Sequence, residues 1–445
     1  MLTFAIRTKN KPENQTEKGA DMRVLIVNTS ERTGGAAVAA NRLMSALINN
    51  GVKAKMLVRD KETDCPTVAA LPQGVRSQWS FLWERLVVLC RLHLRRRHLF
   101  EVDIANAGFD ITQTEEFREA DVIHLHWVNQ GMLSLGGIRR ILRSGKPVVW
   151  TMHDMWPATG ICHLTLGCRQ FKTGCCQCKY LPGGGGRNDL SARVWRKKAA
   201  LLAQDSIHFV ACSRWLESEA RQSALLRGQK VSTIPNPIDT RVYRVTDRAE
   251  ARRQLGLPQE LRLLLFVSQR ATNRNKGMDY LVEACNLLAG QHPEMKAQTG
   301  VVILGGHAEE VAGQLPFQAF PLGYVNDEQQ IVRAYNAADL FVLPSLSENL
   351  PNTIMEAMAC GVPCVGFNVG GIPEEIDHRQ NGYVAEYRNA ADLARGIRWA
   401  LCEADRQTLS ERAVRKVLHS YSQSSVAMRY VEVYNQALAV KNYKL

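Results

Sequence analysis

Two glutamates in the latter half of the chain have a spacing and a setting suited to binding hydroxyl groups. Glu348 and Glu356 are separated by seven residues in the segment Ser-Leu-Ser-Glu-Asn-Leu-Pro-Asn-Thr-Ile-Met-Glu-Ala-Met-Ala-Cys-Gly-Val-Pro, residues 345–363. A carboxylate accepts hydrogen bonds from a diol, whether it belongs to ribose or to a hexose. The pair therefore indicates a nucleotide or sugar site. The alternative is an ordinary strand–helix unit with glutamates on its surface.

The residues around the glutamates predict a strand, a loop and a helix. The apolar run 339–344 ends at a proline and is typical of a buried parallel strand. The helix that follows ends at a glycine and a proline, and Thr353 is its expected N-terminal cap. In open α/β sheets ligands bind outside the carboxyl ends of strands, and a helix N-terminus there suits a diphosphate.

The complete segment resembles the Glu-x7-Glu motif of the family 4 retaining glycosyltransferases. The similarity is most specific over residues 265–375 and covers nearly the whole chain from Arg23. It implies an α/β architecture of the GT-B type, with two Rossmann-like domains facing a central cleft. It also implies a retaining hexosyltransferase that moves a sugar from a nucleotide-diphosphate sugar to a glycan or lipid-linked saccharide acceptor, in surface polysaccharide biosynthesis.

The same resemblance assigns a donor site to both halves of the chain. It places Arg270 and Lys276 on the donor diphosphate, and a forked guanidinium beside a compact ammonium agrees with that role. Glu356 would accept hydrogen bonds from the ribose diol and Glu348 from a donor-sugar hydroxyl. Solvated surface charge is the alternative for the basic pair. The other implied donor contacts are Gly34, Gly35, Tyr324, Asn349, Leu350, Asn352 and Thr353.

One histidine follows the strand predicted from Pro147. Taken alone, His153 would more often be structural, but the resemblance places a histidine here, in the first domain and facing the donor sugar. Asp154 and Trp156 are weaker candidates. We expect His153 to orient the sugar and the domains to close for catalysis. Because basic groups would stabilise the leaving diphosphate, no catalytic metal is expected.

Four cysteines form a candidate structural zinc site. Cys175 and Cys178 have C-x2-C spacing, and Cys162 and Cys168 could complete a tetrahedral thiolate set. Reduced free thiols and a disulfide are the alternatives. The surrounding insert, residues 160–186, resembles a Cys-rich loop in a subset of bacterial polysaccharide-type members.

The composition favours a globular protein with an anionic partner. The chain has 445 residues, 45% of them hydrophobic and 22% charged, with a net charge of +13. Such charge suits nucleotide diphosphates, acidic lipids or nucleic acid, but we find no RNA-binding motif or zinc-finger histidine pattern and expect no nucleic-acid partner. No apolar run of membrane-spanning length exists, and the scattered cysteines favour a reducing cytoplasm.

Residues 79–100 predict a helix with a basic end. Aromatic and aliphatic residues recur at helical spacing, and Arg85, Arg91 and the run Arg95–Arg97 add positive charge. Peripheral contact with an anionic membrane, at its inner face, and a core-packed helix with a solvated basic end are both compatible with this pattern.

The domain organisation follows from the predicted strands and a proline-rich linker. Residues 1–21 are expected to be a disordered leader, and 22–240 an acceptor domain that includes strands near 23–28, 53–59, 121–126 and 207–213. Pro235-Asn-Pro-Ile-Asp resembles the family's hinge. The nucleotide-sugar domain would span 241–410, and the last of the helices in 411–445 would cross back to the first domain.

Two other functions share these features. A GT-B sugar-nucleotide epimerase or phosphorylase has the same fold, although no pyridoxal-binding lysine site is recognisable. A non-catalytic sugar-nucleotide binder could use the same basic charge.

Overall fold

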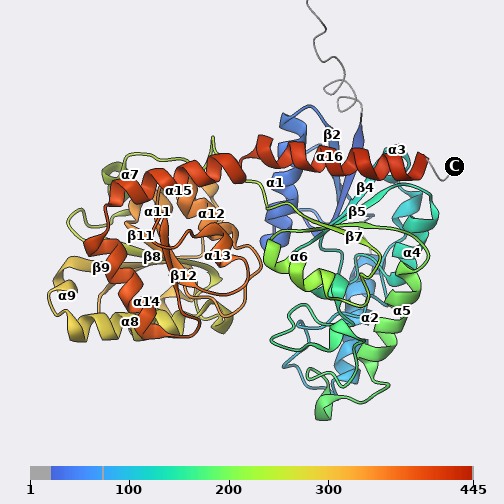
Figure 1. The fold of residues 1–445 in the computed structure, drawn as a ribbon, viewed down its shortest axis with the longest axis horizontal. Helices are drawn as coiled ribbons and strands as arrows, with labels where there is room; N and C mark the ends of the chain where they lie inside the picture. The colour runs from blue at the N-terminus through green and yellow to red at the C-terminus, as the bar shows by residue number, and fades with distance from the viewer. Residues whose placement is uncertain (1–21, 73–74, 443–445) are drawn as a thin grey trace, which may run out of the picture.

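The computed structural model describes residues 22–72 and 75–442, so the expected leader 1–21 lies outside the described residues. Two α/β lobes lie side by side, each built on a parallel sheet with helices packed against it (Figure 1). We call the elements β1 to β7 with their helices and α16 the N-lobe, and the elements α7 to α15 the C-lobe. The predicted fold class, two Rossmann-like α/β units, is confirmed.

The N-lobe contains a seven-stranded sheet in the order β3-β2-β1-β4-β5-β6-β7. Every described pair of neighbours is parallel. The strands are β1 (Arg23–Ser30), β2 (Lys53–Asp60), β3 (Val68–Ala70), β4 (Val122–Leu125), β5 (Val148–Met152), β6 (His208–Ala211) and β7 (Lys230–Thr233). The helices are α1 (Gly35–Asn49), α2 (Val75–Arg91), α3 (Glu115–Glu119), α4 (Leu135–Arg143), α5 (Leu190–Leu202) and α6 (Arg214–Arg221).

The C-lobe repeats this plan with a six-stranded sheet in the order β10-β9-β8-β11-β12-β13. Its strands are β8 (Arg262–Arg270), β9 (Thr299–Gly306), β10 (Gln318–Gly323), β11 (Leu340–Leu343), β12 (Cys364–Phe367) and β13 (Gly382–Ala385). Its helices are α7 (Arg248–Leu255), α8 (Met278–Gln291), α9 (Met295–Gln298), α10 (Ala308–Ala312), α11 (Glu328–Ala337), α12 (Asn352–Ala359), α13 (Ile372–Glu375), α14 (Ala390–Arg398) and α15 (Arg406–Ser420).

Strand order reverses once in each sheet, between β1 and β4 and between β8 and β11. Loops at such a switch point diverge to opposite faces and leave a ligand crevice at the strands' carboxyl ends. The loops after β1, β8 and β11 carry most of the residues that the sequence assigns to the donor. All four residues of β11 are buried, as the apolar run predicted.

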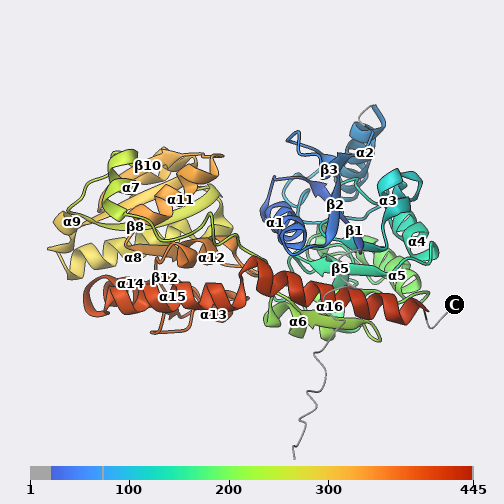
Figure 2. The same ribbon diagram turned by 90° about the horizontal axis from the view of Figure 1, so that it is seen from above.

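The last helix, α16 (Gln423–Asn442), leaves the C-lobe and runs along the N-lobe (Figure 2). It packs on α1 and β5 and buries Tyr430 and Tyr434 in the N-lobe core. The Tyr430 hydroxyl lies 2.9 Å from Thr151 Oγ1, and the Tyr434 hydroxyl lies 2.8 Å from His124 Nδ1. These contacts attach the end of the chain to the first lobe.

One predicted boundary was wrong. The helix predicted over 79–100 ends at Arg91, because His93 and Leu94 have φ angles of 52° and 62° and reverse the chain. The three consecutive arginines that follow therefore lie beyond the helix. Helix α5 begins at Leu190, because the Asp189 side chain accepts a hydrogen bond from the Ala192 N–H and caps it.

Among the described residues, no helix is both long and apolar enough to cross a bilayer.

We predict that Tyr434→Phe lowers the free energy of unfolding by about 1–3 kcal/mol, because it leaves His124 Nδ1 buried without a partner. Tyr434→Ala also removes a buried ring and should cost about 3–5 kcal/mol. Chemical denaturation followed by circular dichroism measures both. Met428→Ala on the exposed side of α16 should stay within about 0.5 kcal/mol of the wild type. Equal losses in Met428→Ala and Tyr434→Phe would contradict the assignment.

Candidate functional site

The predicted site residues come from loops that meet where the two lobes adjoin. The Asn349 amide Nδ2 donates to the backbone oxygen of His153 at 3.2 Å, and its Oδ1 accepts from the Ser213 hydroxyl at 2.7 Å. The Asn352 Nδ2 donates to the Gly35 oxygen at 3.2 Å. Residues of the C-lobe segment around the two glutamates therefore contact the N-lobe loops after β1, β5 and β6.

Lys276 and Glu348 form an ion pair within the C-lobe. Their Nζ and Oε1 atoms are 2.5 Å apart, and both side chains are largely shielded from solvent. The next residue, Gly277, has a φ of 73°, and a Cβ there would lie 1.8 Å from the Pro344 oxygen. Only glycine allows the loop after β8 to approach the end of β11 this closely. Packing therefore requires Gly277, and the preceding Lys276 supplies the charge.

The N-terminus of α12 differs from the prediction in one respect. The expected cap, Thr353, is wrong: the N-cap is Pro351, no side chain caps the helix, and Thr353 lies within its first turn. The Thr353 Oγ1 is buried without a hydrogen-bond partner among the described residues. An uncapped helix start with an unused hydroxyl leaves polar groups available to a ligand.

The glycine pair faces this helix from the other lobe. Gly34 has a φ of 94° and precedes α1, and a Cβ on Gly35 would lie 3.9 Å from Asn352 Nδ2. Two helices therefore begin next to each other, one in each lobe. Both helix starts carry unpaired N–H groups and a partial positive charge.

Glu356 has partners that the sequence did not indicate. Its carboxylate accepts from Arg42 Nη2 on α1 and from the Tyr335 hydroxyl, each at 2.7 Å. Contacts between residues so far apart in sequence have no local signal. The one hint was Arg42 itself, the single charged residue of the helix after the glycine pair.

Two predicted donor residues do not touch the rest of the site. Arg270 ends β8 with its side chain exposed and without a hydrogen bond or ion pair to the described residues. Tyr324 follows β10 and is 57% exposed. Leu350, in contrast, is buried in the C-lobe core.

His153 lies in a cluster of neutral imidazoles. Its Nε2 is 2.9 Å from His126 Nδ1, and its Nδ1 is 3.6 Å from Cys212 Sγ. Burial lowers the pKa of His153 to about 4 and that of His124 to about 3, and it places the pKa of His126 well below its ordinary value. The His153 imidazole is therefore uncharged at neutral pH, while its backbone oxygen makes the contact with Asn349 of the C-lobe.

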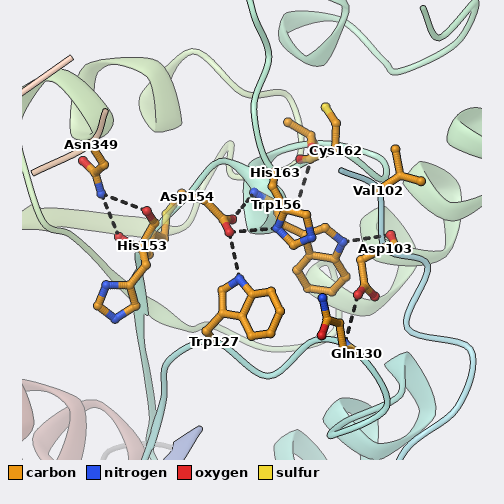
Figure 3. Close-up of polar contacts among 12 residues, drawn as sticks. Val102, Asp103, Trp127, Gln130, His153, Asp154, Trp156, Cys162, His163 and Asn349 are labelled. Atoms are coloured by element: carbon orange, nitrogen blue, oxygen red, sulfur yellow. Dashed lines mark hydrogen bonds and ion pairs between the residues drawn. The ribbon is translucent and has the colours of Figure 1, made fainter. Parts of the chain in front are cut away.

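Asp154 organises the loop after β5 (Figure 3). Its carboxylate accepts from Trp127 Nε1 at 2.9 Å, from the Trp156 N–H at 2.8 Å and from His163 Nδ1 at 2.8 Å. Burial favours the neutral acid, but His163 and these hydrogen bonds outweigh it and hold the pKa of Asp154 below its ordinary value. Trp156 is a core residue whose Nε1 donates to the Asp103 oxygen at 2.9 Å. These two weaker candidates thus support the His153 loop from within.

The cysteine insert folds against the N-lobe without a metal-like arrangement. All twelve cysteines are free thiols, and no group of three or more His, Cys, Asp or Glu side chains in the described residues could hold a metal ion. Burial raises the pKa of Cys162 to about 12 and that of Cys175 to about 11, and Cys175 Sγ accepts from the Gly160 N–H at 3.1 Å. A structural zinc site of Cys162, Cys168, Cys175 and Cys178 stays a prediction.

Helix α2 exposes its apolar face and buries charged residues. Trp79 and Trp83 are 61% and 52% exposed, and Leu82 and Leu86 share their face. A cavity of about 320 Å³ lies beside the tryptophans. Arg85 was expected to add surface charge, but it is buried. It forms an ion pair with Asp103, in which Arg85 Nη2 and Asp103 Oδ2 are 3.0 Å apart.

The imidazole cluster predicts how stability depends on pH. Each imidazole has a folded pKa below its unfolded value of about 6.5, so the unfolded chain binds more protons as pH falls. Stability is therefore fully present above pH 6.5 and is lost toward the folded values near 4 and 3. Each histidine should contribute up to about 1.4 kcal/mol per pH unit in this window.

Urea denaturation at pH 7, 6 and 5 should show this loss. His126→Gln should reduce the slope, which is the change in the free energy of unfolding with pH, by up to about 1.4 kcal/mol per pH unit. His419→Gln, on the exposed side of α15, should leave the slope unchanged. A slope identical in the wild type and His126→Gln would show that His126 is charged in the folded protein.

Two family models and a full-length relative match this chain. The model of Glycosyltransferase Family 4 matches residues 33–242, and that of Glycosyl transferases group 1 matches residues 247–416. A D-inositol 3-phosphate glycosyltransferase of Thermobispora bispora is 30% identical, over 98% of this chain and 95% of that protein.

Two solved structures have the same fold. Sucrose-phosphate synthase of Thermosynechococcus elongatus superposes with a TM-score of 0.64 at 18% identity, covering 94% of this chain and 100% of that chain. HepE of Anabaena, in complex with UDP and glucose, has a TM-score of 0.61 at 18% identity, covering 93% of this chain and 100% of that chain. The chain belongs to the family 4 glycosyltransferases and has the GT-B fold.

Proposed function

We propose that the protein transfers a sugar from a nucleotide-diphosphate sugar to a glycan or lipid-linked saccharide acceptor, with retention of anomeric configuration, in surface polysaccharide biosynthesis. The observation that carries the proposal is the Lys276–Glu348 ion pair beside the uncapped start of α12, at the switch point of the C-lobe sheet. A cation, free N–H groups and a carboxylate at one place suit an anionic sugar donor.

The donor diphosphate would lie between the two helix starts. Lys276 supplies a positive charge, and Arg270 has an uncommitted guanidinium at the end of β8. N–H groups at the starts of α12 and α1 would complete the cradle. Lys276 would exchange part of its contact with Glu348 for phosphate oxygens, which frees the carboxylate to accept a hydrogen bond from a sugar hydroxyl.

The transfer step needs stabilisation of the leaving group more than a strong base. As the bond from the anomeric carbon to the phosphate oxygen breaks, negative charge grows on the diphosphate, where the cations and N–H groups are fixed in advance. The acceptor hydroxyl attacks from the same face, and its proton passes to the departing phosphate oxygen. His153 is neutral, and it would orient the sugar by hydrogen bonding rather than by charge once a ring nitrogen exchanges its contact with His126 or Cys212 for a sugar hydroxyl.

The comparisons support a nucleotide sugar as donor. The structurally similar HepE was solved with UDP and glucose, and a full-length relative is a D-inositol 3-phosphate glycosyltransferase. UDP-sugars are therefore the first donors to test, followed by GDP-, ADP- and dTDP-sugars. A bound donor raises the apparent melting temperature by mass action, so a thermal-shift screen identifies the base.

With the donor from that screen, we predict that Lys276→Ala lowers kcat by about 10²–10³-fold, because it removes charge that stabilises the leaving diphosphate. Steady-state transfer to a saccharide acceptor, with analysis of product anomers, measures both rate and stereochemistry. Lys296→Ala removes an equal charge from the exposed surface of α9 and should keep wild-type turnover.

Three outcomes would contradict the proposal: full turnover by Lys276→Ala, an inverted product, or conversion of the donor to an epimer without acceptor. The last would identify a sugar-nucleotide epimerase.

We also propose that α2 is the contact with an anionic membrane that carries a lipid-linked acceptor. Its apolar face holds Trp79 and Trp83 at the surface, and Arg95, Arg96 and Arg97 follow the helix as exposed cations. Apolar side chains that enter the acyl boundary beside cations that meet lipid phosphates are the features of an interfacial helix.

We predict that Trp79→Ser with Trp83→Ser weakens binding to phosphatidylglycerol vesicles at least tenfold, since both rings lose their lipid contacts. Replacing the three arginines by glutamine should cost about 1 kcal/mol each and remove most of the salt dependence. Vesicle co-sedimentation at two salt concentrations measures both. Leu418→Ser with Met428→Ser, at exposed apolar sites elsewhere, is the matched control. Equal binding by the tryptophan and control variants would contradict the assignment.

A further inference from the structure

An ion pair joins the lobes next to the proposed donor site. Arg42 lies on α1 of the N-lobe, and its Nη2 donates to Glu356 Oε1 on α12 of the C-lobe at 2.7 Å. The side chains are 11% and 9% exposed. Burying two charges is costly unless the other polar atoms of both side chains also form hydrogen bonds. The hydrogen-bond partners of those atoms therefore indicate whether the pair binds a ligand.

The Glu356 carboxylate has unused acceptor capacity. Its Oε2 accepts from the Tyr335 hydroxyl at 2.7 Å, and its Oε1 accepts from Arg42. Each carboxylate oxygen can accept about two hydrogen bonds, so each retains one free position. Two oxygens that can each take one more hydroxyl match a vicinal diol.

The Arg42 guanidinium has an unused donor. Its Nη1 is buried and has no hydrogen-bond partner among the described residues. The guanidinium carbon lies 4.9 Å from the ring centre of Tyr243, so one face of the group is already covered. A buried N–H without a partner is costly and rare, and a ligand oxygen would satisfy it.

The pair also stands in a fixed relation to the two helix starts. Gly35 opens α1 and Asn352 opens α12, and these residues share a hydrogen bond of 3.2 Å. Arg42 lies about two turns into α1, and Glu356 lies about one turn into α12. The ion pair therefore sets the separation of the helix starts at the place where the proposed function puts the diphosphate.

We propose that Arg42 is a donor-positioning residue supplied by the N-lobe: it holds the Glu356 carboxylate toward the ribose diol of the bound nucleotide and donates its Nη1–H to a ribose oxygen. The inference rests on the proposed function, in which Glu356 receives the ribose. It adds recognition of the ribose by both lobes, so a nucleotide would be held tightly only when the lobes adjoin. An arginine that merely joined the lobes would be indifferent to the ribose hydroxyls.

The test uses the full chain and calorimetric titration with UDP, GDP and ADP and with their 2′-deoxy counterparts. The wild type should prefer the ribonucleotide of its chosen base about tenfold. Arg42→Met should raise the Kd for that ribonucleotide about tenfold or more and reduce the ribose preference to about twofold or less, because both ribose contacts depend on Arg42.

Two further variants keep the outcome interpretable. Arg42→Lys keeps the positive charge opposite Glu356 and so the fold, but it lacks the second planar N–H group; its Kd should rise about three- to tenfold with part of the preference lost. Arg214→Met removes a different inter-lobe arginine, 3.3 Å from Glu374, and should retain wild-type affinity and preference.

The possible results separate the two proposals. A wild type that binds none of the six nucleotides overturns this inference, and one that also binds no dTDP overturns the proposed function with it. A wild type that binds, with Arg42→Lys or folded Arg42→Met retaining its full ribose preference, overturns the role of Arg42 alone. An equal loss of affinity for the ribonucleotide and its 2′-deoxy form, with the preference unchanged, would mean that Arg42 only joins the lobes.

Discussion

The structure depends on two parallel sheets whose carboxyl ends adjoin through hydrogen bonds. Asn349 is shared by both lobes, since its amide donates to His153 and accepts from Ser213. Glu374 of the C-lobe accepts from the backbone N–H groups of Arg214 and Trp215, and so satisfies the start of α6 in the other lobe. Water can replace such polar contacts at small net cost, because each group is well solvated when exposed. A polar boundary of this kind suits lobes that separate to admit a substrate and adjoin to hold it.

The charges at this boundary are paired in a way that a ligand could rearrange. Glu348 is held by Lys276 in the same lobe, whereas Glu356 is held by Arg42 from the other lobe. Each carboxylate is thereby held in position by a cation, and each remains able to accept a hydroxyl. Arg270 has no hydrogen-bond or ion-pair partner among the described residues, so its positive charge adds to the two ion pairs. An incoming diphosphate could take this cation as a partner without breaking an ion pair.

Sequence reasoning succeeded for features set by residues that are neighbours in the sequence and failed for contacts between residues far apart in it. The β11 strand and the α12 helix follow from apolar runs, glycines and prolines that act on their immediate neighbours. The contact of Arg42 with Glu356 joins residues 314 positions apart, and no periodicity can announce it. The Thr353 cap was wrong because Pro351 takes the N-cap position and places the threonine inside the helix. The roles of these residues toward a substrate stay predictions, since a fold positions side chains without naming their ligands.

Helix α2 shows how burial of charge can define a surface. A helix on a globular protein normally turns its apolar face inward, but here Glu84 accepts from the buried N–H groups of Ile104 and Ala105. Burial and the nearby Asp103 raise the pKa of Glu84 to about 9, so it is neutral, and Arg85 compensates Asp103. Glu84 and Arg85 thus anchor the inner face of α2 by polar contacts, and its tryptophans lie on the opposite, exposed face. The backbone oxygen of Asp103 also accepts from the Trp156 indole N–H, so Asp103 links α2 to the loop of His153. A partner at the outer face of α2 would therefore bind an element that is tied to the N-lobe side of the site.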